Sequence, residues 1–421
     1  MKSVAKETEA KVVTQYANVE GALPSTVLQE ISQNMLSSDF PGQLNSASSS
    51  GAIRQKLWRQ RNIIKPRPNI PKSFDDYMRT EIPDNFTHTA DGGRFIIYKD
   101  WVNDDKDQCM VLFMSQWAVG IMKNHTTWLF DGTFQTAPPP FSQVYIGMAA
   151  SETGGKGIPC IYGLLPDKSL NTYKIMFSKI KEVIGNDHRM KTIITDFEKA
   201  VFTACRTVFP EADHKGCRFH HNSSIWRKLG EYGLQALFHR NPSFQETIYK
   251  LYALSYVPVD RVITTYNEVI VPFIQDNINA DSDWMEHSEQ LEEFGFYFEN
   301  TWLERRNGRS PLFKPETWNH YRTVKENGLA TNNMLESHNR TWNSLAGRNP
   351  NVWHIQELFV KQDAEARRSY LSNAVGQDLH NNTGRKQRSL DARHRIKFVL
   401  DNFENMTISD YVSTIAHDLQ N

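Results

Sequence analysis

The segment Trp128-Leu129-Phe130-Asp131-Gly132-Thr133-Phe134 is an apolar run that ends on an aspartate. A second run of this kind, Ile193-Ile194-Thr195-Asp196, lies later in the chain. Short apolar runs bounded by turn residues are typical of buried strands. A carboxylate at the end of a buried strand is held rigidly and is well placed to bind a divalent cation. The two runs therefore predict neighbouring strands and a candidate metal site.

The pattern around these runs predicts an RNase H-like sheet. Strands are expected at residues 94–98, 110–114, 127–134, 143–150, 158–165 and 192–195. Helical spacing of apolar residues predicts helices within 24–36, 53–62, 173–184 and 201–208. From residue 127 on, the order is three strands, a helix, a strand and a helix, as in an RNase H-like mixed sheet. In such a sheet the first and fourth of these strands lie side by side, so Asp131 and Asp196 can meet.

The predicted fold class is α/β, with an RNase H-like mixed β-sheet core flanked by helices and a mostly α-helical insertion. We expect six segments: an N-terminal segment and linker (1–52), a basic α+β region (53–125), the first part of the core (126–221), the helical insertion (222–330), the closing helix of the core (331–370) and a basic C-terminal tail (371–421).

The composition is that of an ordinary globular protein of 421 residues with a formal net charge of zero. The sequence has no apolar run of about 18 residues, so no membrane span is expected. The N-terminus lacks the apolar stretch of a secretory signal. The four cysteines, Cys109, Cys160, Cys205 and Cys217, show no paired spacing, which indicates a reduced, intracellular protein.

Charge is segregated along the chain. Residues 51–73 contain seven Lys or Arg and no acid, whereas residues 281–299 contain seven acids and no Lys or Arg. Basic segments neutralise DNA phosphates, and the alternative is a solvated surface. The candidate DNA-binding residues of the first segment are Arg54, Lys56, Arg59 and Arg61. The tail is basic again from Arg385 to Lys397, a composition shared with nuclear-import signals, so we expect a location in the nucleus.

Five motifs occur in a fixed order. They are Asp131-Gly132-Thr133-Phe134, Pro140-Phe141-Ser142-Gln143, Asp196-Phe197-Glu198-Lys199-Ala200, Gly216-Cys217-Arg218-Phe219-His220 and Thr331-Asn332-Asn333-Met334-Leu335-Glu336. Together they resemble the transposases of Mutator-like elements (MULE transposases). Asn300-Thr301-Trp302 is similar to part of that family's insertion. The resemblance covers roughly residues 53–370, and the five ordered motifs make it specific.

The resemblance implies a DDE-type transposase that cleaves DNA strands and transfers them. It implies that Asp131, Asp196 and Glu336 are the catalytic and metal-binding residues, with Mg²⁺ or Mn²⁺ as the cofactor. Our hypothesis is that Asp131 bridges two ions and that the other two acids each complete one of them. The implied partners are element-end DNA and target DNA, and a homo-oligomer is also considered. The alternative function is a transposase-derived DNA-binding or regulatory protein without cleavage activity; a nuclease acting on RNA–DNA hybrids or branched DNA is a third option.

Each acid also has a structural alternative. Asp131 before Gly132 is a common turn pair, and Asp196 is a candidate helix N-cap. Glu336 lies three residues after Asn333, as in a capping box, and can pair with Arg340 on the same helix face. The competitors for the third catalytic position are Glu299 and Glu304.

Cys217 and His220 supply half the ligands of a zinc site. A packed cysteine and a hydrogen-bonded histidine are the alternative, so the pair is noted as a structural motif of open role. MULE transposases often carry an N-terminal zinc domain that recognises DNA. The first 120 residues of this chain contain only Cys109 and His88 as Cys or His ligands, too few for a structural zinc site with four ligands.

Overall fold

The structure is a computed structural model that describes residues 2–17, 24–36, 49–64, 68–150, 157–304, 308–326, 328, 333–374 and 384–420. The chain divides into two compact units, and each is described by itself. The first unit comprises Met1–Ile70 and Thr80–Phe86, and the second comprises Pro71–Arg79 and Thr87–Asn421.

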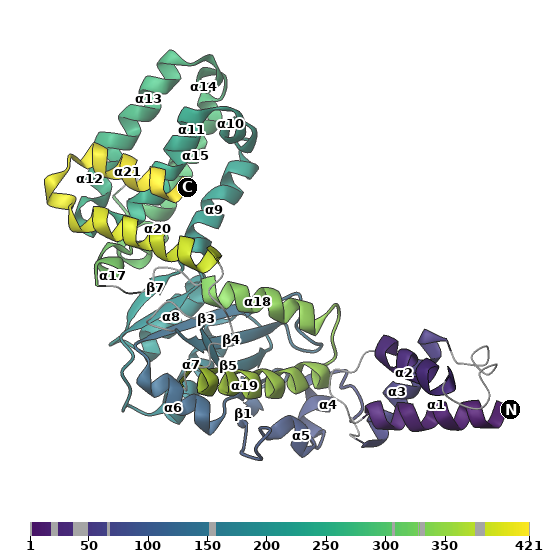
Figure 1. Ribbon diagram of the computed structural model, residues 1–421. Helices are drawn as coiled ribbons and strands as arrows, with labels where there is room; N and C mark the ends of the chain where they lie inside the picture. The colour runs from purple at the N-terminus through teal and green to yellow at the C-terminus, as the bar shows by residue number, and fades with distance from the viewer. Residues whose placement is uncertain are drawn as a thin grey trace. The chain divides into compact units, whose positions relative to one another are not determined.

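The second unit contains a seven-stranded mixed sheet (Figure 1). Its strands are β1 (Ile96–Trp101), β2 (Cys109–Phe113), β3 (Thr127–Thr133), β4 (Gln143–Ala149), β5 (Ile158–Leu165), β6 (Thr192–Thr195) and β7 (Asp213–Gly216). Their order across the sheet is β1-β2-β5-β4-β3-β6-β7. Every residue of β4 is buried, because helices cover both faces at the centre of the sheet. This burial explains why the central strands are nearly continuous apolar runs.

The pairing of β3 with β6 decides the topology. β3 pairs antiparallel with β4 and parallel with β6, with Leu129 opposite Ile194. This is the relationship expected between the first and fourth strands of an RNase H-like sheet, and the α/β fold class is confirmed. Strand β7 extends the sheet parallel to β6. Strand β7 is not among the strands predicted from the sequence, because Asp213–Gly216 contains no apolar run.

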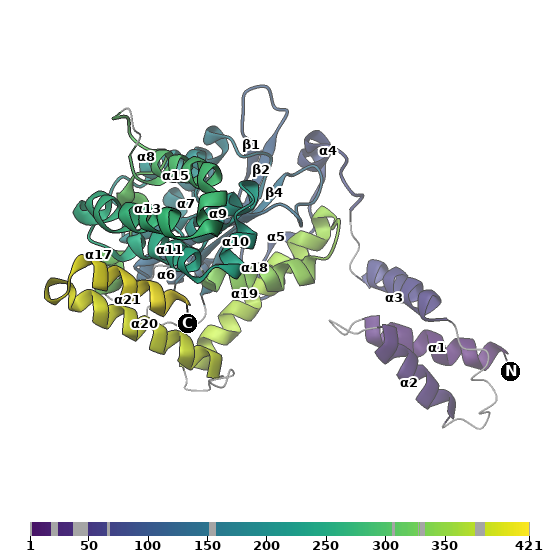
Figure 2. The same ribbon diagram turned by 90° about the horizontal axis from the view of Figure 1, so that it is seen from above.

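Five helices cover the two faces of the sheet: α6 (Gln116–Asn124), α7 (Leu170–Ile184), α8 (Lys199–Val208), α18 (Asn333–Ala346) and α19 (Val352–Ala374). Successive side chains of a strand point to opposite faces. The ring centroids of Phe130 and of Phe177 on α7 lie 5.3 Å apart. The next residue, Asp131, accepts a hydrogen bond from Asn339 on α18. Helices α6, α7 and α8 therefore cover one face, and α18 and α19 cover the other (Figure 2).

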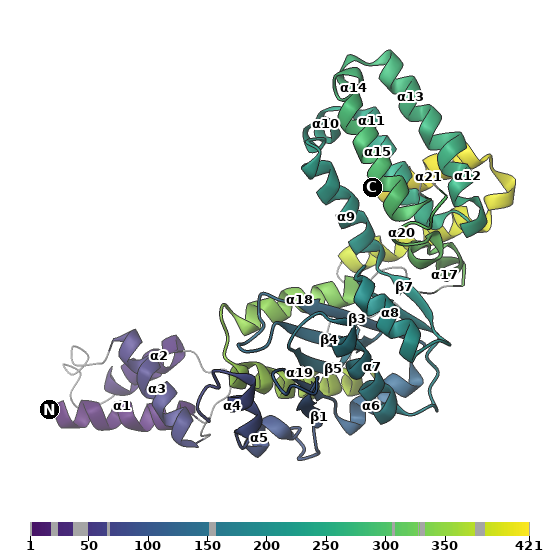
Figure 3. The ribbon, with the colours of Figure 1, turned by 180° about the vertical axis from the view of Figure 1, so that it is seen from behind.

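A helical insertion follows β7 and lies beside the end of the sheet that holds β6 and β7 (Figure 3). Its helices are α9 (Arg218–Glu231), α10 (Gln235–Arg240), α11 (Pro242–Ala253), α12 (Val262–Thr265), α13 (Val271–Ala280), α14 (Ser282–Glu286), α15 (Ser288–Trp302), α16 (Pro315–Trp318) and α17 (Tyr321–Lys325). One core of buried side chains, which includes Trp284, Phe298 and Trp318, holds them together. Helices α20 (Gly384–Asp401) and α21 (Ile408–Gln420) add Leu400 and Tyr411 to this core. The segment predicted as a basic tail therefore contains two packed helices.

The first unit contains three helices, α1 (Lys2–Ala17), α2 (Pro24–Leu36) and α3 (Ser50–Ile64). They share a small core formed by Val12, Val13, Val27, Ile31, Ile53 and Leu57. Helix α3 spans the boundary predicted at residue 52. Two short helices, α4 (Phe74–Arg79) and α5 (Asp84–Thr87), precede β1 in the chain. None of the helices in the described ranges has the length and apolarity needed to cross a membrane.

Candidate active site

Asp131 is fixed through both carboxylate oxygens. The backbone N–H of Gly132 donates to its Oδ1 at 2.9 Å, and the side-chain amide of Asn339 donates to its Oδ2 at 2.9 Å. Both Asp131 and Gly132 belong to β3, so the pair does not form the turn considered as the alternative. A Cβ at position 132 would lie 2.7 Å from Oε1 of Gln143, so a side chain there would require the buried Gln143 to move.

Asp196 directly follows β6, at the position that corresponds to Asp131 on the neighbouring strand β3. Leu129 pairs with Ile194, and each aspartate lies two residues further along its chain. With a side-chain period of two and a strand spacing of about 4.8 Å, the register brings the two carboxylates to the same face of neighbouring strands. Oδ1 of Asp196 is buried and has no hydrogen-bond partner in the described part of the chain. The N-cap of α8 is Glu198, so Asp196 does not have the capping role considered for it.

Helix α18 brings Glu336 to the same face of the sheet. Two contacts dock this helix on β3: the Asn339 amide donates to Asp131, and the hydroxyl of Thr133 donates to Oδ1 of Asn343 at 3.2 Å. Glu336 lies one turn before Asn339, so it shares the docked face. Oε1 of Glu336 is buried without a hydrogen-bond partner among the described residues.

Asp131 acts electrostatically on both other acids. Burial raises the pKa of Asp131 to about 7, although its two hydrogen bonds lower it. Burial, followed by the charge of Asp131, raises the pKa of Asp196. The same two causes raise the pKa of Glu336 to about 7, against the opposing charge of Arg340. The structure therefore places Asp196 and Glu336 each near Asp131, and it leaves their negative charges poorly compensated, an arrangement that favours a bound cation.

A second group of potential ligands adjoins the acids. Cys217 is the N-cap of α9, and its N–H donates to the carbonyl oxygen of Thr195 at 2.8 Å. His220 lies on the first turn of α9, and burial lowers its pKa more than the charge of Asp196 raises it. Three potential ligand atoms, one from each of Cys217, His220 and Glu336, lie within 4.8 Å of one another. Within the described ranges, the three acids do not form a group as tight as this one.

The comparison with protein families agrees with this geometry. Residues 127–224 match the MULE transposase domain. This part of the chain is a MULE transposase domain. It contains Asp131, Asp196, Cys217 and His220, whereas Glu336 lies beyond the matched residues. No match to the chain was found among curated proteins. The MULE domain supports a transposase-related function and implies DNA as the partner.

The MULE domain also holds a polar network that links several of the ordered motifs. The amide of Gln143 donates to the hydroxyl of Tyr173 at 3.1 Å, and that hydroxyl donates to Oε2 of Glu198 at 3.2 Å. Nζ of Lys168 lies 3.9 Å from Oε2 of Glu198 and 3.6 Å from the ring centre of Phe134. Phe134, Gln143 and Glu198 belong to three of the five ordered motifs. Lys168, in the loop before α7, and Tyr173, on α7, belong to none of them.

Asn339 was also missed. Its spacing of three residues from Glu336 on one helix was the available signal. The competing acids have other surroundings: Glu299 accepts a hydrogen bond from Tyr266 at 3.4 Å within the insertion, and Glu304 is exposed after α15. The side chain of Asn333, the other half of the proposed capping box, lies outside the described residues.

The candidate DNA-binding residues lie on α3 of the first unit. Arg59 is exposed, whereas Lys56 forms an ion pair with Glu9 of α1. Lys56 therefore contributes to the packing of the first unit. The side chains of Arg54 and Arg61 lie outside the described residues.

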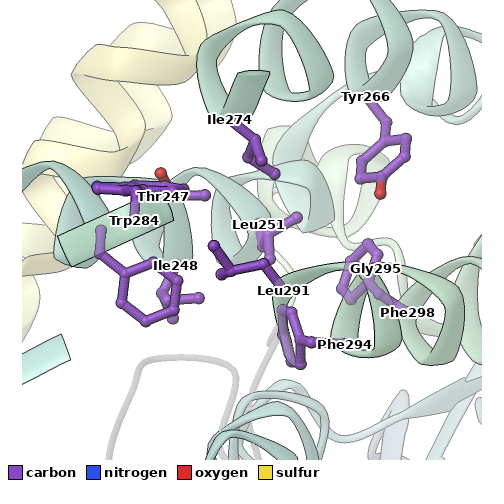
Figure 4. Close-up of a pocket in the computed structure, with 11 residues that line it drawn as sticks. Thr247, Ile248, Leu251, Tyr266, Ile274, Trp284, Leu291, Phe294, Gly295 and Phe298 are labelled. Atoms are coloured by element: carbon purple, nitrogen blue, oxygen red, sulfur yellow. The ribbon is translucent and has the colours of Figure 1, made fainter. Parts of the chain in front are cut away.

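The insertion contains a small cavity of about 20 Å³ that is apolar (Figure 4). Leu251, Trp284 and Phe298 are among the side chains around it, and none of the described residues that line it is charged. A space of this size holds about one water molecule. The cavity is thus a packing feature of the insertion and lacks the groups needed for catalysis.

Proposed function

We propose that the protein is a DDE-type transposase that cleaves DNA strands and transfers them to a target in a metal-dependent reaction. The observation that carries the proposal is the convergence of Asp131, Asp196 and Glu336 on one face of the sheet, where the charge of Asp131 raises the pKa of both other acids. The MULE domain supports the transposase class, and the geometry of these acids supports the DDE assignment.

The residues fit a divalent cation of the magnesium type. Asp196 and Glu336 each present a buried oxygen without a hydrogen-bond partner among the described residues, and Mg²⁺ and Mn²⁺ prefer oxygen ligands. When bound, such a cation supplies positive charge that stabilises the attacking and leaving oxygens of a phosphodiester. The three acids would hold it, and no serine or tyrosine nucleophile is required.

The protein's own residues then position the substrate. Asp131 keeps one orientation because Gly132 and Asn339 both hydrogen-bond to it. Lys168 lies near enough to Asp196 to lower its pKa, so its ammonium group is placed to attract a phosphate at the same edge. The exposed aromatic ring of Phe134, which lies under Lys168, is placed to contact a nucleobase.

The partners of this reaction are element-end DNA and target DNA. Exposed basic residues such as Arg59 would add phosphate contacts. Each chain has a single set of the three acids, so joining two element ends would use two copies of the chain. Because the substrate is chromosomal DNA, we also propose a location in the nucleus.

The test is strand transfer by the full chain with labelled terminal-repeat DNA in Mg²⁺ or Mn²⁺. Asp131→Asn and Asp196→Asn should abolish cleavage while their urea unfolding midpoints stay close to that of the wild type. Glu304→Ala, which removes a competing acid, is the matched control and should cleave normally. Sequence-specific DNA binding by the wild type without cleavage in either metal would instead favour the transposase-derived regulatory protein.

A further inference from the structure

Cys217, His220 and Glu336 form a second potential metal site beside the three acids. Their ligand atoms lie within 4.8 Å of one another, although they come from two helices far apart in sequence. Cys217 is fully buried. Nδ1 of His220 and Oε1 of Glu336 are buried atoms without hydrogen-bond partners among the described residues. Two polar atoms left in this state are costly unless a further group binds them.

The local backbone explains why these side chains converge. The N–H of Cys217 is anchored on Thr195, the last residue of β6, so the start of α9 is fixed next to Asp196. His220 lies three residues after Cys217, on the same side of the helix. Helix α18 presents Glu336 from the other side because Asn339 holds it on Asp131. The site is therefore built from elements that the core of the second unit already positions.

The donor atoms differ in chemistry from those of the three acids. A thiolate and an imidazole are soft or intermediate ligands, which favour Zn²⁺ over Mg²⁺. Thiolate, neutral imidazole and carboxylate together carry two negative charges, which a zinc ion neutralises. Three protein ligands leave a fourth tetrahedral position for water or substrate. A carboxylate has two oxygens, so Glu336 can face this ion with one oxygen and the acids with the other.

We propose that Cys217, His220 and Glu336 bind a zinc-type cation that is distinct from the magnesium-type ion of the proposed function. Its role is to position Glu336: the ion joins the start of α9 to α18 and keeps this carboxylate near Asp131. Glu336 belongs to both sites, but Cys217 and His220 belong only to the zinc site, so the two proposals are tested by different residues.

The test is metal binding by the purified full chain. After incubation with zinc chloride and removal of excess metal, elemental analysis should find one zinc per chain. With cobalt chloride, the chain should show the near-ultraviolet charge-transfer absorption of a thiolate bound to Co²⁺. Cys217→Ser should lose this absorption, and His220→Ala should lose at least ten-fold in zinc affinity. Cys160→Ser, which changes another buried cysteine, is the matched control and should keep both signals.

The wild type gives a measurement that does not depend on folding of the variants. X-ray absorption at the zinc edge should show one sulfur ligand at about 2.3 Å. Sub-stoichiometric zinc, a spectrum without sulfur, or a Cys217→Ser variant that keeps the cobalt absorption would overturn the proposal. Magnesium-dependent cleavage by a chain that binds no zinc would also overturn it and leave the proposed function standing. Zinc binding that persists in Asp131→Asn, which should not cleave DNA, would support the separate site.

Discussion

Gly216→Ala should perturb the candidate active site through a neighbouring ring. A Cβ at position 216, the last residue of β7, would lie 2.1 Å from Cζ and 2.2 Å from Cε1 of Phe197. Carbon atoms pack at about 3.5 Å or more, so the ring has to retreat by roughly 1.4 Å. It has little room, because Trp302 and Phe313 stand edge-on to it at centroid distances of 4.9 and 5.1 Å.

Overpacking of this kind costs about 1–3 kcal/mol of the free energy of unfolding. Phe197 directly follows Asp196, so the displacement also shifts the carboxylate. A misplacement of about 1 Å lowers an enzymatic rate by about 100-fold. We therefore expect Gly216→Ala to remain folded, with a lower urea midpoint, and to cleave terminal-repeat DNA about 100 times more slowly than the wild type.

Two further variants test whether the close approach between residue 216 and Phe197 is the cause of these effects. Gly120→Ala in α6 adds the same methyl group where no atom lies within 4 Å, and it should stabilise the helix by about 0.5–1 kcal/mol. Adding Phe197→Leu to Gly216→Ala should relieve part of the overpacking, so the two stability changes should be non-additive by about 0.5–3 kcal/mol. Additive effects, or a Gly216→Ala variant with wild-type stability and rate, would show that the close approach has no energetic consequence.

Three more predictions concern hydrogen bonds and titration. Asn339→Ala removes the amide bound to Asp131 and should lower the free energy of unfolding at pH 8 by about 1.5–3 kcal/mol; a change below about 0.5 kcal/mol in urea unfolding would contradict this. Burial lowers the pKa of His214 to about 3, so below pH 6.5 the unfolded chain takes up a proton that the folded chain excludes. The contribution of His214 to the free energy of unfolding should therefore fall by about 1.4 kcal/mol for each pH unit as the pH is lowered from 6 to 4. In urea titrations, the free energy of unfolding of His214→Phe should depend less steeply on pH than that of the wild type. Ser115→Ala removes both the N-cap of α6 and the hydroxyl that donates to the buried Asp363 at 2.7 Å. The free energy of unfolding at neutral pH, measured by thermal unfolding, should therefore fall by about 2–4 kcal/mol. An unchanged melting temperature would contradict a stabilising role of this buried contact.

The sequence predicts the centre of the sheet well because burial on both faces requires apolar residues. β3 and β6 can be predicted from the sequence for this reason, and their position as neighbours follows from the order of the elements along the chain. β7 has no such signal, because Asp213–Gly216 lies at the sheet edge and is mostly polar. Its backbone pairs with β6 over all four of its residues. Pairing of this kind depends on the neighbouring strand and leaves no pattern in the short segment itself.

The end of the chain illustrates a second limit. The basic residues near Arg395 favour a solvated tail, yet Tyr411 and Ile415 are fully buried in the core of the insertion. Arg395 itself pairs with Asp418 at 3.1 Å, so part of the basic charge is compensated within the last two helices. Charge composition describes one face of a helix, and the partner for the opposite face lies more than a hundred residues earlier in the chain.

The third acid shows most clearly what a local pattern cannot decide. A capping box and a catalytic carboxylate both place Glu336 in the first turn of a helix, so spacing within the helix does not separate them. The distinction comes from what the helix faces: Asn339 binds Asp131, and the charge of that aspartate raises the pKa of Glu336. A capping glutamate is most stable where its carboxylate is ionised and solvated, whereas this carboxylate is partly buried beside another acid. The cost of that position is difficult to explain by helix capping alone, and the proposed cation would provide the compensating charge.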